Sequence, residues 1–132
     1  MLASVARLNA GASNIANGGT TGPLPQAAAA PPLAAAEGAP RFYQPVDVVL
    51  KSTGEGGSAG VAATYRPRSP AYVRQYDPSA PFADGDGMVA APNVDLAQEA
   101  VGILEASLLF KANLAVFKAA DEMAKRMLDT TA

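Results

Sequence analysis

The sequence predicts a mainly α-helical chain with a small β unit, in which two terminal helices flank an irregular centre. Three observations predict this class. Apolar residues recur at helical spacing at both ends of the chain, and most of the 12 glycines and 11 prolines fall between Gly18 and Pro92. Alanine makes up much of the 49% apolar fraction, so few large side chains remain to build a core.

The first 17 residues read as an amphipathic helix within an N-terminal segment over residues 1–19. Its apolar positions follow the three- and four-residue steps of one helical face. We expect Gly18 or Gly19 to cap its end in the left-handed conformation. A helix this short needs a partner to pack against. The face consists of Val5, Leu8, Ala12 and Ile15.

The centre divides into a flexible Ala/Pro linker over residues 20–40 and a small β or irregular segment over residues 41–92. Proline and glycine interrupt any helix that the alanines of the linker could start. Aromatic and β-branched residues predict strands at 41–50 and 61–67, joined by a Gly/Ser turn over 52–60. A short third strand is expected at 72–75.

A long C-terminal helix is the strongest structural signal, within a segment over residues 93–132. Asn93 or Asp95 can cap its start, and the helical pattern continues to about Asp129. One row of residues alternates steps of four and three, and a second row beside it is apolar throughout. The first row is Leu96, Ala100, Ile103, Ser107, Phe110, Leu114, Phe117, Asp121, Ala124 and Leu128; the second is Ala97, Val101, Leu104, Leu108, Ala112, Ala115 and Ala119.

The width of this apolar surface predicts self-assembly. Two adjacent rows form a stripe wider than the seam between two helices, and the N-terminal helix is only about half as long. An exposed stripe of this size usually marks an assembly surface. Asp121, which interrupts the first row, could set the register of an assembly or lie at its solvated margin.

Composition excludes most site chemistry. The chain has no histidine and no cysteine, and no serine lies in a nucleophile motif, so we expect no catalytic residues, no cofactor and no metal. The segment 83–87 (ADGDG) lacks the remaining ligands of a calcium loop and is better explained as a turn. Three tyrosines between arginines, Tyr65, Tyr72 and Tyr76, could stack on nucleic acid, or they could pack in a small β core or contact another protein.

A net charge of −2 favours the β core and predicts no nucleic-acid partner. No uninterrupted apolar run reaches the length of a membrane span, so none is expected. The N-terminus also lacks the pattern of a cleaved signal peptide.

Two separated motifs resemble the bacterial flagellar rod and hook axial protein family, most closely its proximal-rod FlgC type. The segment 13–22 (SNIANGGTTG) is similar to the family's N-terminal signature, in which a Ser-x-Asn-Ile-Ala-Asn segment closes the first helix. The segment 76–113 is similar to a Tyr-Asp-Pro, Pro-Asn-Val and long-helix series. Met88 and Phe110 replace the usual aromatic and tyrosine, and Ala80 stands where histidine is common.

The resemblance implies a structural subunit of the flagellar basal-body rod that serves motility. It implies that the terminal helices pair as an antiparallel coiled coil, and that the partners are copies of this chain, other rod proteins and the type III export apparatus. The expected location is the periplasmic rod, reached without a cleaved signal peptide. A soluble export adaptor that docks a partner through its C-terminal helix is the alternative.

The predicted assembly interface combines both helices. The polar members from the signature can bond neighbouring backbone or subunits. The complete set is Val5, Leu8, Ala12, Asn14, Ile15, Asn17, Leu96, Ala100, Val101, Ile103, Leu104, Leu108, Phe110, Leu114, Phe117 and Leu128.

Overall fold

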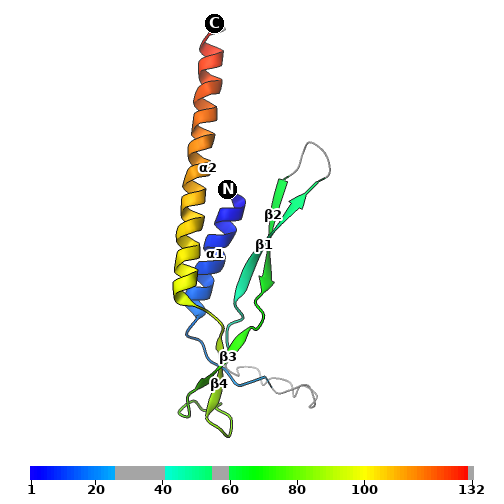
Figure 1. The fold of residues 1–132 in the computed structure, drawn as a ribbon, viewed down its shortest axis with the longest axis vertical. Helices are drawn as coiled ribbons and strands as arrows, with labels where there is room; N and C mark the ends of the chain where they lie inside the picture. The colour runs from blue at the N-terminus through cyan, green and yellow to red at the C-terminus, as the bar shows by residue number, and fades with distance from the viewer. Residues whose placement is uncertain (26–40, 55–59, 131–132) are drawn as a thin grey trace.

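A computed structural model describes residues 1–25, 41–54 and 60–130. Two helices lie side by side and antiparallel, and α1 lies between α2 and a β-hairpin (Figure 1). A second hairpin forms the foot of the molecule (Figure 1). The elements in order are α1 (Leu2–Asn17), β1 (Val46–Thr53), β2 (Gly60–Pro67), β3 (Tyr72–Tyr76), β4 (Met88–Pro92) and α2 (Leu96–Thr130).

Both predicted helices are present. The start of α2 is capped by Asp95, whose Oδ1 accepts the backbone N–H groups of Ala97 at 2.9 Å and Gln98 at 3.1 Å. The expected left-handed cap of α1 is wrong, because Gly18 is right-handed with φ −63°. The end of α1 is held by side chains and by a turn, so it needs no left-handed residue. At 35 residues, α2 runs well beyond the 16 residues of α1 (Figure 1).

The expected single β unit is instead two separate antiparallel pairs, β1–β2 and β3–β4. The first strand begins at Val46 and not at residue 41, since Pro45 directly precedes it. Strand β4 was not expected, because its sequence, MVAAP, has little β propensity of its own. It forms through pairing with β3, in a register that places Tyr76 opposite Met88.

The chain leaving α1 is anchored on β4, which departs from the free linker expected from residue 20. Gly22 and Ala90 exchange both backbone hydrogen bonds, at 3.0 and 2.9 Å. A Cβ on Gly22 would lie 2.7 Å from the backbone nitrogen of Phe42, so only glycine fits this close approach. The rest of the predicted linker, residues 26–40, and residues 55–59 of the predicted Gly/Ser turn lie outside the described residues.

The core of the described residues is small and consists of small side chains. Apart from prolines, its buried apolar members are one valine in β4 and four alanines, namely Val89, Ala10, Ala90, Ala91 and Ala106. Such side chains bury little apolar area each, so this core alone contributes little hydrophobic stabilisation. The large apolar residues of α2 lie mostly at the surface.

Candidate assembly surface

The first apolar row of α2 is the one that faces α1. Ile103, Phe110 and Leu114 are half-buried, whereas Leu96 and Ala100, at the row's start, are exposed. Above α1 the row continues without cover, and both Phe117 and Leu128 are exposed. The part of the row that α1 covers, together with buried Ala106, forms the interface between the helices.

The face of α1 that packs in the molecule differs from the predicted one. Val5, Ala12 and Ile15 are exposed and Leu8 is half-buried. The buried residues of α1 are smaller or polar, namely Ser4, Ala10, Gly11 and Asn14. The apolar face of α1 therefore lies at the edge of the packed side, and Val5 and Ile15 keep 38% and 36% of their surface exposed. Small residues take its place because the helices approach closely.

The second row of α2 is a continuous exposed surface. Its large members, which we name the outer row, are Val101, Leu104 and Leu108, with exposed fractions of 54%, 64% and 66%. Alanines extend the row toward both ends of the helix. Further large apolar residues of the upper half are also exposed, namely Val116, Phe117, Met123 and Met127. Apolar patches of this extent mark interaction sites.

A polar junction ties both helices to the base of the β1–β2 hairpin. We define it as Asn14, Tyr43, Asp47, Arg68 and Glu99. Asn14 is 1% exposed and uses its whole hydrogen-bonding capacity. Its Nδ2 donates to the Val46 carbonyl and to Glu99 Oε1, each at 3.0 Å. Its Oδ1 accepts the Val46 N–H at 3.0 Å and the Tyr43 hydroxyl at 3.1 Å.

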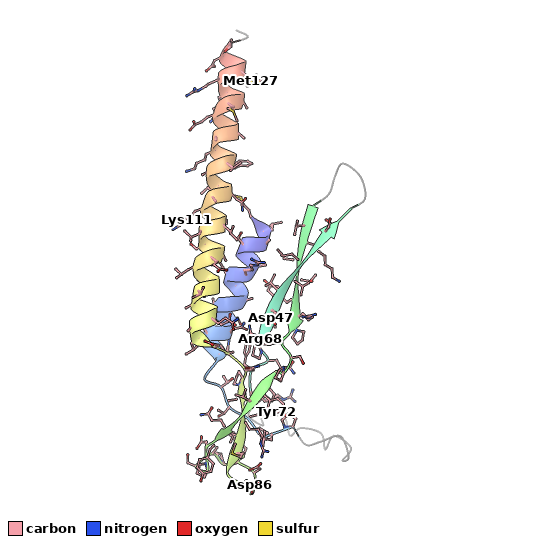
Figure 2. All side chains as sticks on the ribbon, in the orientation of Figure 1. Asp47, Arg68, Tyr72, Asp86, Lys111 and Met127 are labelled. Carbon is pink, nitrogen blue, oxygen red and sulfur yellow. The ribbon has the colours of Figure 1, made fainter. Side chains whose placement is uncertain are left out.

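Arg68 completes the junction from the end of β2. Its Nη2 lies 2.7 Å from both Asp47 Oδ1 and Glu99 Oε1, and its Nη1 donates to the Asn93 carbonyl at 3.0 Å. The hydrogen bond to Asp47 raises the pKa of Arg68. Asp47 and Arg68 lie together near the base of the helix pair (Figure 2). A pocket of about 260 Å³ opens beside the junction, between α1, α2 and β1.

The remaining polar residues of the 13–22 signature also make bonds within the chain. Asn17 Nδ2 donates to the Ser13 carbonyl at 2.8 Å. Thr20 Oγ1 donates to the Asn17 carbonyl and accepts the Tyr43 N–H, each at 2.9 Å. Ser13 and Tyr43 join their hydroxyls at 3.0 Å. The signature thus closes α1 and attaches it to the segment before β1.

Sequence reasoning missed four of the five junction residues. Glu99 lies in the first turn of α2, where a carboxylate complements the helix dipole, and it also accepts bonds from Asn14 and Arg68. Asp47 and Arg68 are 21 positions apart, and antiparallel pairing of β1 with β2 brings them together. Asn14 of the 13–22 signature was the available signal, because an asparagine that becomes buried requires polar partners.

The other sites considered have structural roles. Asp84 Oδ1 accepts the N–H groups of Asp86 and Met88, so the 83–87 segment is a turn between β3 and β4. These bonds, the one from Met88 first, lower the pKa of Asp84. Tyr72 packs on Phe42 with ring centroids 5.4 Å apart.

Two of the three tyrosines are not in a β core. Tyr65 and Tyr76 are exposed, at 53% and 68%. Asp121 lies at a solvated margin of the single chain, where its carboxylate pairs with Lys125 at 2.7 Å.

Within the described residues, α2 has the length and apolar composition that crossing a membrane requires. The criterion is weak for a single helix, and Glu105 and Lys111 place charges among its apolar residues. Lys111 projects from the side of the helix (Figure 2).

Comparison with known proteins identifies flagellar relatives. The family model described as the C-terminal part of flagellar basal body rod FlgEFG proteins matches residues 86–130. Flagellar basal-body rod protein FlgC of Salmonella typhimurium strain LT2 is 34% identical over 125 residues, which cover 92% of this chain and 83% of the relative. FlgC of Escherichia coli O6:H1 is 32% identical over 127 residues with the same coverage. FlgC of Agrobacterium fabrum is 36% identical over 58 residues, 44% of this chain and 42% of the relative.

Proposed function

The chain belongs to the FlgC family of flagellar basal-body rod proteins and is a structural subunit of the basal-body rod, and we propose that the outer row of α2 is its main assembly surface. The observation that carries this proposal is the exposure of Val101, Leu104 and Leu108 on a helix whose neighbouring row already packs on α1. Copies of this chain and other rod proteins are the proposed occupants of that surface.

The energetics favour repeated contacts. Burying a fully exposed leucine or valine stabilises by about 1.5–3 kcal/mol, and these residues are already one-third to one-half covered. One contact along the outer row is then worth a few kcal/mol before the entropic cost of association. A helical array repeats such a contact on every subunit, and heterologous contacts that do not close extend into filaments.

The apolar face of α1 enlarges the proposed surface. Val5, Ala12 and Ile15 lie on the part of α1 that the described residues cover only in part. We propose that they contact neighbouring subunits, while the first row of α2 pairs with α1 as an antiparallel coiled coil. The predicted division into 1–19, 20–40, 41–92 and 93–132 then separates two assembly helices from the segments between them.

The proposed route to the rod is export through the flagellar type III apparatus, without a cleaved signal peptide, to the periplasm. No catalysis, cofactor, metal or nucleic acid has a part in this function. The soluble adaptor is the weaker alternative. The relatives named as rod proteins match 92% of the chain, so the likeness extends well beyond the C-terminal helix, the one element that an adaptor would need.

Sedimentation of the purified chain tests the assembly surface. We expect association that grows with protein concentration and that is lost in Leu104→Asp. Gln98→Ala is the matched control, because Gln98 is an exposed polar residue of the same helix. A chain that stays monomeric at high concentration, or a Leu104→Asp variant that associates like the parent, would count against the outer row.

A further inference from the structure

We propose that the hydrogen bond between Asn14 and Glu99 fixes the register of α1 along α2. The proposal rests on the proposed function and deepens it. The register sets how the exposed residues of α1 and the outer row of α2 are aligned on the surface that each subunit presents to its neighbours. The register is nevertheless a property of the single chain. It can therefore be tested apart from assembly.

Apolar packing alone does not specify this register. The first row of α2 repeats large apolar residues every seven positions, at Leu96, Ile103, Phe110 and Phe117. A seven-residue slip moves α1 by about 10.5 Å and brings equivalent apolar residues opposite it. The row continues above α1, where Phe117 is 69% exposed. A slipped α1 therefore finds an apolar surface of similar character.

The connection from α1 to the rest of the chain is not taut. Between the end of α1 and the anchored Gly22, the backbone folds back through a bond from the Thr20 N–H to the Asn17 carbonyl. The peptide units from Asn17 to Gly22, extended, would reach roughly 17 Å. The turn takes up part of this length, so opening it would let α1 move along α2.

The polar junction does distinguish the two registers. In the observed one, Asn14 faces Glu99, and Gly11 faces Ile103. After a seven-residue slip, Asn14 would face Ala106, which has no polar side chain. The buried amide would lose Glu99, its one partner on α2, and Glu99 would lose the bond from α1. Polar groups buried without partners are costly, which is how one polar pair can select a register among apolar alternatives.

Register selection has a consequence for the rod. The exposed face of α1, with Val5 and Ile15, and the outer row of α2 are aligned only in one register. A mixture of registers would give subunits whose two apolar surfaces are offset by about 10.5 Å. Such subunits could not repeat the same contacts along an array.

Disulfide trapping in dilute, monomeric protein tests this proposal, because the chain has no cysteine of its own. Ser4 and Leu109 line one cavity, so Ser4→Cys with Leu109→Cys reports the observed register. Ser4→Cys with Val116→Cys reports the slip. We expect the first disulfide to dominate in the parent, and Asn14→Leu to shift the ratio toward the second by about tenfold or more.

Two further variants sharpen the test. Glu99→Gln keeps an oxygen that accepts from Asn14, so we expect it to retain the observed register. Asn9→Ala removes an exposed asparagine of α1 and should change nothing. An unchanged ratio in Asn14→Leu, or loss of both disulfides, would overturn the proposal, because the junction would then have no selective role. Neither result would bear on the outer row.

Discussion

A Cβ on Gly11 of α1 would lie 2.9 Å from Cγ1 of Ile103 on α2. This distance is shorter than an ordinary carbon–carbon contact, so the two helices pack with backbone against side chain at this point. From the sequence, Gly11 only weakens α1 by about 1 kcal/mol relative to alanine. In the folded chain the same glycine makes the helix contact.

Gly11→Ala should therefore destabilise the chain by about 1 kcal/mol. Its gain in helix propensity of about 1 kcal/mol is outweighed by overpacking against Ile103, which costs about 1–3 kcal/mol. Gly102 is the matched control, because a Cβ there meets nothing within 4 Å. Gly102→Ala should stabilise by about 1 kcal/mol. Urea unfolding followed by circular dichroism measures the change in unfolding free energy for both variants. If both variants are stabilised, or both destabilised, the close packing of Gly11 against Ile103 is refuted.

Gly22→Ala should destabilise the folded chain by about 1–3 kcal/mol, at least as much as Gly11→Ala. The added Cβ would meet backbone atoms of Arg41 and Phe42, which cannot rotate away as a side chain can. Gly19→Ala is the control, since no atom lies within 4 Å of a Cβ there. Thermal unfolding measures the difference, and the midpoint of Gly22→Ala should lie below that of Gly19→Ala. A Gly22→Ala variant as stable as Gly19→Ala would show that the anchor on β4 is loose.

Arg68→Ala should cost about 2 kcal/mol, because it leaves the Glu99 carboxylate, only 11% exposed in its side chain, without its cation. The partner Asp47 is 42% exposed and contributes less, since solvent screens it. Arg66→Ala removes a neighbouring exposed arginine and should have little effect. Denaturant unfolding tests the difference. Equal stability of the two variants would mean that the junction contributes nothing through charge.

The β3–β4 turn should weaken at acidic pH. The folded-state pKa of Asp84 is lowered below its ordinary value of 3.8. The stabilisation is then complete above that value and is lost as pH falls through the lower folded pKa. Protection of the Met88 amide, which compares its exchange rate with the intrinsic rate at the same pH, should fall there in the parent and depend less on pH in Asp84→Asn. Asp86→Asn should behave like the parent, because only its backbone N–H joins the turn. If the protection of the Met88 amide changes with pH in the same way in the parent and in Asp84→Asn, Asp84 does not stabilise the turn through its charge.

Periodic features of the fold could be predicted from the sequence, and the reason is local. The spacing of apolar residues gives both helices, and Asp95 marks the start of the second. The spacing did not show which of the two rows of α2 packs on α1. The packed face of α1 was not predicted, because the largest apolar residues do not face the partner when backbones approach closely. Val5 and Ile15 are exposed, and Gly11 is buried.

The unpredicted parts depend on contacts between distant residues. Strand β4 has weak intrinsic propensity, and it forms because β3 and Gly22 supply hydrogen bonds to its backbone. The polar junction unites residues from both helices and both strands of the first hairpin. No local pattern links Asn14 to Glu99, which is 85 positions away. Motif resemblance identified the family, but only the fold explains why its signature carries an asparagine here.

The most direct test of the account is motility in a strain that lacks its own copy of this rod protein. The double variant Leu104→Asp and Leu108→Asp changes exposed residues only, so the purified chain should keep the helical content and unfolding midpoint of the parent. We predict that it fails to restore swimming and that isolated basal bodies lack a complete rod, whereas Gln98→Ala restores both. A double variant that swims like the parent would contradict the assignment of the outer row as the assembly surface.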